Sequence, residues 1–125
     1  MKYLLDTHAI IWYFEDSGEL SENTLAILRD KDCLIHISSA SIWETAIKIS
    51  LGKLDLDFNK LLEHVRKSDF SLLQVDLSYL KKLMSLPFIH RDPFDRLLIA
   101  TALATGMTII TADKNIHQYE VQWIW

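Results

Sequence analysis

Four acidic residues occupy positions where a carboxylate is costly unless it has a function. Asp6 and Asp113 each follow an apolar run with the length of a strand, and Glu44 and Asp95 lie on or beside the apolar face of expected helices. If these carboxylates meet in a partly desolvated cleft, their mutual repulsion must be relieved by protonation or by a bound metal. The pattern therefore indicates a cation site.

The ligand atoms of such a site would be carboxylate oxygens. Oxygen ligands suit hard cations, so Mg²⁺ or Mn²⁺ is expected rather than Zn²⁺. The histidines have no zinc-like spacing, and we interpret each of them as a surface or structural residue: His8, His36, His64, His90 and His117.

Each acid also has a purely structural explanation. Asp6 and Asp113 would make good caps for helices that begin after the strands. Asp95, three residues after Asp92, resembles the second member of a capping box. Glu44 could pair with Lys48, four residues later, on a solvated helix flank. One acid alone would therefore prove nothing, and only the combined pattern favours a site.

Helical periodicity distinguishes Asp95 from its neighbour Asp92. The positions three, four and seven residues after Asp95 are Leu98, Ile99 and Ala102, the stripe that should face the sheet. Asp95 is therefore expected to lead an inward-facing row, whereas Asp92 is the more natural helix cap.

The elements that must position these residues alternate along the chain. Strands are predicted at 2–5, 34–37, 72–75, 107–111 and 121–125, and helices at 8–14, 24–31, 39–51, 59–67, 79–86 and 92–106, with a turn or short helix at 112–115. This order predicts an α/β domain with helices on both faces of a mainly parallel sheet of four to five strands. Because ligands bind at the carboxyl ends of such strands, Asp6 and Asp113 should share one edge.

Composition sets the class of protein. Half of the 125 residues are apolar, so one domain over residues 1–125 is expected. A single cysteine, Cys33, excludes an internal disulfide framework and indicates a reducing, cytoplasmic setting. No apolar run approaches the roughly 20 residues that cross a bilayer, so no membrane association is expected. The net charge of −4 does not exclude a nucleic-acid partner, because without the four site acids the remaining 13 acids equal the 13 lysines and arginines.

Four blocks of the sequence resemble the PIN-domain family, in particular toxins of the VapC type. They occur in the family's order and are Leu-Leu-Asp6-Thr-His, Ser41-Ile-Trp43-Glu44-Thr-Ala-Ile-Lys48, His90-Arg-Asp-Pro-Phe-Asp95-Arg-Leu-Leu-Ile-Ala-Thr-Ala, and Ile-Thr111-Ala-Asp113. The third block is particularly specific, and the resemblance covers essentially the whole chain.

The resemblance implies a three-layer α/β/α domain that cleaves RNA with Mg²⁺ or Mn²⁺ in an acidic pocket. Asp6, Glu44, Asp95 and Asp113 match the family's acidic quartet, and Asp92 would be an outer ligand. Thr7 and Thr111 match positions beside the metal-binding acids, where a hydroxyl could orient a carboxylate or a water. A cognate antitoxin protein and a homodimer are also implied.

Cationic residues close to the acids are candidate contacts to the phosphates of RNA. A polyanion can approach a carboxylate cluster only if positive charge offsets the repulsion. Arg91, Arg96, Lys48 and Lys114 lie within a few residues of the acids, although Lys48 and Lys114 could equally be solvated charges. The tryptophans are interpreted as packing residues, and Trp12 could extend an apolar patch that a second copy buries.

Two other functional classes compete with a metal-dependent endoribonuclease. A phosphoacceptor signalling domain of the receiver type also places acids around Mg²⁺, but it requires an acidic pair after the first strand, and Asp6 is followed by Thr7 and His8. A binding module that has lost catalysis would keep the acids only as caps. That reading gives no reason for an acid on the stripe that contains Leu98.

Overall fold

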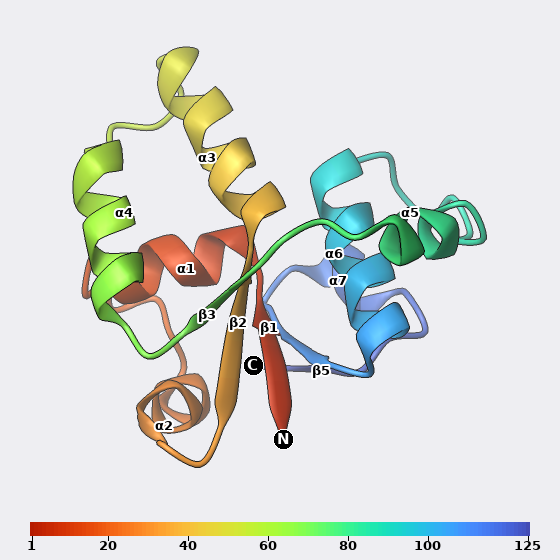
Figure 1. Ribbon diagram of the computed structural model, residues 1–125, viewed down its shortest axis with the longest axis horizontal. Helices are drawn as coiled ribbons and strands as arrows, with labels where there is room; N and C mark the ends of the chain where they lie inside the picture. Colours follow the sequence, from red (N-terminus) through yellow and green to blue (C-terminus); the bar gives the residue numbers. More distant parts are fainter.

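The computed structural model describes all residues from Met1 to Trp125 and alternates strands with helices (Figure 1). The strands are β1 (Lys2–Leu5), β2 (Leu34–Ser38), β3 (Ser71–Leu73), β4 (Thr108–Ile110) and β5 (Trp123–Ile124). The helices are α1 (Thr7–Phe14), α2 (Glu22–Arg29), α3 (Ser39–Ser50), α4 (Phe58–Lys67), α5 (Leu77–Leu83), α6 (Pro93–Thr105) and α7 (Lys114–His117). None of these helices is long and apolar enough to cross a bilayer.

All neighbouring strands of the sheet are parallel, in the order β3-β2-β1-β4-β5. The chain moves outward from β1 through β2 to β3 and then returns to the other side of β1 with β4. The order reverses between β1 and β4, which is where α/β sheets bind ligands. The receiver-type fold has the strand order 2-1-3-4-5, so this topology does not support the phosphoacceptor alternative.

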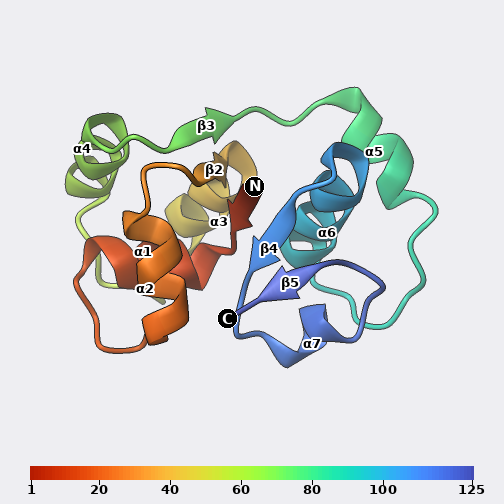
Figure 2. The same cartoon turned by 90° about the horizontal axis from the view of Figure 1, so that it is seen from below.

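The two faces of the sheet bury separate apolar clusters. Because successive strand residues point to opposite faces, Tyr3 and Leu5 of β1 pack with residues of α1, α2 and α4, whereas Leu4 packs with α6 and Ile116 of α7. Figures 1 and 2 show the same division, with α1, α2 and α4 on one side of the sheet and α5, α6 and α7 on the other. The predicted three-layer α/β/α architecture is confirmed.

Helix α6 has the clearest local determinants in the chain. The side chain of Asp92 accepts hydrogen bonds from the backbone N–H groups of Phe94 and Asp95, and Pro93 stands at the first helical position. Gly106 ends the helix at φ 74°, a left-handed conformation that favours glycine. The predicted cap and end of this helix are therefore both confirmed.

Several element boundaries differ from the sequence prediction, including both ends of α5, which spans Leu77–Leu83. Strand β3 ends at Leu73 instead of Val75, because its partner β2 turns into α3 directly after the last registered pair. Helix α5 begins two residues earlier than predicted, since Asp76 rather than Ser78 provides the cap. The last strand is shortened to two residues, the length over which β4 offers backbone partners.

The tryptophans do not all pack in the interior. Trp12 on α1 is partly buried against the core and meets Trp125 edge-on, with ring centroids 5.9 Å apart. Trp43 on α3 is 60% exposed and meets the Phe94 ring edge-on, with ring centroids 5.1 Å apart. Trp43 therefore does not pack in the core of the domain, and packing at an interface stays a prediction for this residue.

Candidate acidic site

Asp6 and Asp113 meet through a threonine at the end of β4. The backbone N–H of Asp6 donates to the carbonyl of Ile110 at 3.1 Å, which brings the carboxyl ends of β1 and β4 together. The hydroxyl of Thr111 donates to Oδ2 of Asp6 and accepts from the backbone N–H of Asp113 at 3.0 Å. Thr111 is fully buried and links the two acids through its hydroxyl.

Both strand-end acids also cap the helices that follow them. Asp6 Oδ1 accepts from the backbone N–H of Ala9 at 2.8 Å, and Asp113 Oδ1 accepts from that of Asn115 at 2.8 Å. The structural and functional interpretations of these residues are therefore compatible, because a cap uses only one carboxylate oxygen.

Glu44 reaches the same region from α3. It is 6% exposed, accepts a 2.7 Å hydrogen bond from the Thr7 hydroxyl at Oε1, and pairs at Oε2 with Lys48 Nζ at 3.1 Å. The expected ion pair with Lys48 is present, but its carboxylate end lies inside the protein rather than on a solvated flank. Thr7 orients Glu44 in the same way that Thr111 orients Asp6.

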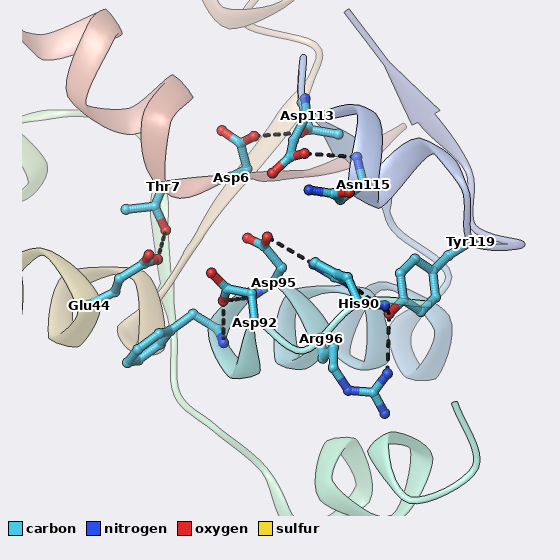
Figure 3. A network of polar contacts seen from close by, with 12 residues as sticks. Asp6, Thr7, Glu44, His90, Asp92, Asp95, Arg96, Asp113, Asn115 and Tyr119 are labelled. Carbon is cyan, nitrogen blue, oxygen red and sulfur yellow. Dashed lines mark hydrogen bonds and ion pairs between the residues drawn. The ribbon is translucent and has the colours of Figure 1, made fainter. Parts of the chain in front are cut away.

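Asp95 comes from the first turn of α6 and faces the strand-end acids. The stripe behind it is buried, with Leu98, Ile99 and Ala102 each at most 2% exposed, as its periodicity predicted. Its Oδ2 lies 3.1 Å from Nε2 of His90. Figure 3 shows Asp6, Asp95 and Asp113 directed toward one common region, with Glu44 and Asp92 beside it.

The acids of this region disfavour each other's charged forms. The pKa of Asp95 is raised to about 7, mainly by burial and to a smaller extent by Asp92, Asp113 and Glu44, while the hydrogen bond with His90 acts in the opposite direction. Burial also raises the pKa of Asp6, to which Asp113 contributes, while Thr111 and other neighbours lower it. The region is therefore short of positive charge.

The donor chemistry of the region fits a hard divalent cation, but the side chains are engaged with their own neighbours. One carboxylate oxygen of Asp6 accepts a hydrogen bond from Thr111, one of Glu44 accepts from Thr7, and one of Asp95 lies within hydrogen-bond distance of His90. In this arrangement no three Asp, Glu, His or Cys side chains lie close enough together to hold a metal ion. The structure thus gathers the predicted acids at one sheet edge, though not around one point.

The predicted phosphate contacts differ in their exposure. Arg91 and Lys114 are exposed, and the side chain of Lys48 is 37% exposed while it pairs with Glu44. Arg96 is only 6% exposed, and its guanidinium donates to the carbonyl of Pro87 at 2.8 Å. A phosphate contact was therefore the wrong prediction for Arg96, since its side chain points into the protein.

Sequence reasoning did not identify the two residues that support Asp95. His90 was interpreted as a surface or structural residue, and Tyr119 was not considered, yet the hydroxyl of Tyr119 lies 2.8 Å from Nδ1 of His90. The two residues are 29 positions apart in the chain, and no periodic pattern connects them. The only signal was that His90 belongs to the third block of the resemblance.

The raised pKa of Asp95 predicts a pH dependence of stability for the metal-free protein. Between the ordinary pKa of 3.8 and the folded value of about 7, the folded state holds a proton that the unfolded state has released. This contribution to the free energy of unfolding is full below about pH 4 and is lost as the pH rises through 7. With EDTA present, denaturant titrations should show that the free energy of unfolding falls by about 2–4 kcal/mol between pH 4 and pH 7.

The Asp95→Asn variant isolates this effect. Asparagine does not titrate, so the variant should lose less stability than the parent protein between pH 4 and pH 7. Equal pH profiles for the two proteins would contradict the raised pKa of Asp95.

A family model described as PIN domain matches residues 3–122 of this sequence. The chain belongs to the PIN-domain family. The resemblance noted in the sequence is thereby confirmed, and the acids above occupy the strand ends and helix faces of a PIN domain. No curated protein matches the sequence.

Solved structures share the PIN fold over nearly the whole chain. VapBC2 from Rickettsia felis, determined with a DNA fragment from its promoter, matches with a TM-score of 0.79 and 19% identity, over 100% of this chain and 99% of that chain. A toxin-antitoxin complex from Klebsiella pneumoniae gives 0.66 and 14% identity over 98% and 96% of the two chains. FitAcB from Neisseria gonorrhoeae gives 0.65 and 20% identity, again over 98% and 96%.

Proposed function

We propose that this PIN-domain protein is an endoribonuclease that depends on Mg²⁺ or Mn²⁺. The observation that carries the proposal is the gathering of five acids at one sheet edge, with raised pKa values for Asp6 and Asp95, where the Lys48–Glu44 contact is the one ion pair with a lysine or arginine. A divalent cation would supply the missing positive charge. A binding module that kept these acids only as caps would not need Asp95 on a buried stripe.

The cation-holding residues in this proposal are Asp6, Glu44, Asp95 and Asp113, with Asp92 as an outer group that also caps α6. A divalent cation held by these residues would supply Lewis-acid chemistry, which makes a bound water more acidic and offsets negative charge at the phosphorus and its leaving oxygen. Thr7 and Thr111 hold the carboxylates of Glu44 and Asp6 in place through their hydroxyls. The expected products carry 5′-phosphate and 3′-hydroxyl ends.

Arg91 and Lys48 are the proposed contacts to the RNA backbone, because both side chains reach solvent beside the acids. Replacing Arg91 by glutamine should raise KM for RNA about fivefold with little change in kcat. It should also reduce by about one the number of counterions that RNA binding releases, as measured from the slope of affinity against salt concentration. Cleavage kinetics at several salt concentrations would measure both effects. Arg66→Gln on the distant helix α4 is the matched control, and an equal rise in KM there would contradict a specific role for Arg91.

The biological role that we propose is that of the toxin in a toxin-antitoxin pair in the cytoplasm. The similarity in fold to VapBC2 and to a toxin-antitoxin complex supports this assignment. A small antitoxin protein would bind and inhibit the enzyme, and a homodimer is the expected assembly. Co-expression of the chain with the gene adjacent to it, followed by affinity purification, would recover a stable complex if the partner is encoded there.

The direct test uses the purified chain, a mixture of single-stranded RNA substrates and either Mn²⁺ or EDTA. Internal cleavage that requires the cation, with products that can be ligated through their 5′-phosphate, is the expected result. Incubation with a small phosphodonor, followed by intact-mass measurement, covers the receiver-type alternative. Phosphorylation without RNA cleavage would overturn the proposed function.

A further inference from the structure

A continuous chain of hydrogen bonds leads from a buried arginine to Asp95. Arg96 donates from its guanidinium to the hydroxyl oxygen of Tyr119 at 3.1 Å, and the backbone N–H of His90 reaches the same oxygen at 3.3 Å. Tyr119 Oη lies 2.8 Å from His90 Nδ1, and His90 Nε2 lies 3.1 Å from Asp95 Oδ2. Figure 3 shows these four side chains in sequence.

Hydrogen-bond accounting fixes the direction of every bond in this chain. A guanidinium and a backbone N–H can only donate, so together they occupy both lone pairs of the Tyr119 hydroxyl oxygen. The hydroxyl proton must then go to Nδ1 of His90, which makes Nδ1 an acceptor. The remaining ring proton of a neutral His90 is on Nε2, and it is donated to Asp95 Oδ2.

The residues of the chain are held rigidly. Tyr119 is 5% exposed and Arg96 6%, and the side chain of His90 is 14% exposed. The Arg96 guanidinium also donates to the carbonyl of Pro87 and lies 4.2 Å from the centre of the Phe88 ring. Because buried polar groups are costly unless they are paired, this arrangement resists rotation of the imidazole.

We propose that Tyr119 and His90 are positioning residues for Asp95. The hydroxyl of Tyr119 selects the form of His90 that carries its proton on Nε2. The Nε2–H group then holds Oδ2 of Asp95 in place. The other oxygen, Oδ1, accepts no hydrogen bond within the protein and is left to face the cation. This inference rests on the proposed function, because it assigns Asp95 to the cation. It adds an orienting path that runs from the segment after α7 to the first turn of α6.

Replacing Tyr119 by phenylalanine removes the hydroxyl but keeps the buried ring. Nitrogen-15 NMR of the imidazole side chains should show His90 protonated at Nε2 in the parent protein and a mixture of forms in Tyr119→Phe. The affinity for Mn²⁺, measured by calorimetry without RNA, should fall about 10-fold or more, as is common when a group that orients a metal ligand is lost. Tyr79→Phe on α5, another buried tyrosine, is the matched control and should change neither measurement.

A second variant separates orientation from simple packing. In His90→Gln the side-chain amide can donate to Asp95 without any choice of ring form, so adding Tyr119→Phe to this variant should weaken Mn²⁺ binding less than about threefold. His90→Leu has no donor and should lose affinity to at least the extent of Tyr119→Phe.

The outcomes distinguish the two proposals. A parent protein that binds no Mn²⁺ would overturn the proposed function and with it the role of this path. A parent protein that binds Mn²⁺ with an affinity unchanged by Tyr119→Phe would overturn the positioning role alone. Protonation of His90 at Nδ1 in the parent protein would also overturn the positioning role alone.

Discussion

Replacement of Asp95 by asparagine is expected to lower the rate of Mn²⁺-dependent RNA cleavage by about 1000-fold or more. Asparagine has the shape of aspartate and can still accept the hydrogen bond from His90 Nε2, but it lacks the charge that holds the cation. Loss of several kcal/mol of metal-supplied stabilisation at the transition state corresponds to a factor of this size. Single-turnover cleavage at saturating RNA measures the effect.

The folded state of the Asp95→Asn variant should be at least as stable as that of the parent protein without metal. Burial raises the pKa of the Asp95 carboxyl, so removing its charge relieves an unfavourable term, as is common at functional sites. Asp76→Asn, which changes an exposed helix-capping acid on α5, is the matched control. Rates for Asp95→Asn within tenfold of the control would contradict the assignment of Asp95.

Binding of Mn²⁺ is expected to stabilise the protein strongly. At a concentration about 100 times its Kd, a ligand that binds only the folded state adds about 2.7 kcal/mol to the free energy of unfolding. In a domain of this size, that corresponds to a rise in Tm of about 10 °C. The rise should also be larger at pH 8 than at pH 5, because the acids must be charged to hold the cation.

The Asp6→Asn variant should lose most of this stabilisation by Mn²⁺. Asparagine preserves the helix cap at Ala9 and a polar partner for Thr111, so the fold should persist. Glu63→Gln on α4, which changes an exposed acid in a surface ion pair, should retain the full rise in Tm. A rise in Asp6→Asn equal to that of Glu63→Gln would show that the cation binds elsewhere.

Much of the site could be predicted because it depends on local patterns. An acid directly after an apolar strand lies at the carboxyl edge of a parallel sheet, which places Asp6 and Asp113 without knowledge of the tertiary structure. The apolar stripe of α6 places Asp95 toward the sheet in the same way. The apolar pattern alone does not place Glu44, because this residue lies at the border of the apolar arc, and the structure shows it both buried and paired with Lys48.

Other features of the site depend on side-chain direction and on contacts between distant segments. Arg96 follows Asp95 in the sequence, but successive helical residues point about 100° apart, so the arginine turns away from the acids. The contact of His90 with Tyr119 joins two loops that only the tertiary fold brings together. Tyrosine hydroxyls at such contacts leave no periodic signal in the sequence.

The position of the acids on both sides of the β1–β4 pair has a consequence for the order in which the protein folds. Asp6 and its partner Thr111 are 105 positions apart in the chain, and Thr111 also accepts a hydrogen bond from the backbone N–H of Asp113. Contacts of such long sequence separation form late in folding. A folding intermediate in which β4 has not yet paired with β1 therefore lacks the assembled acidic region.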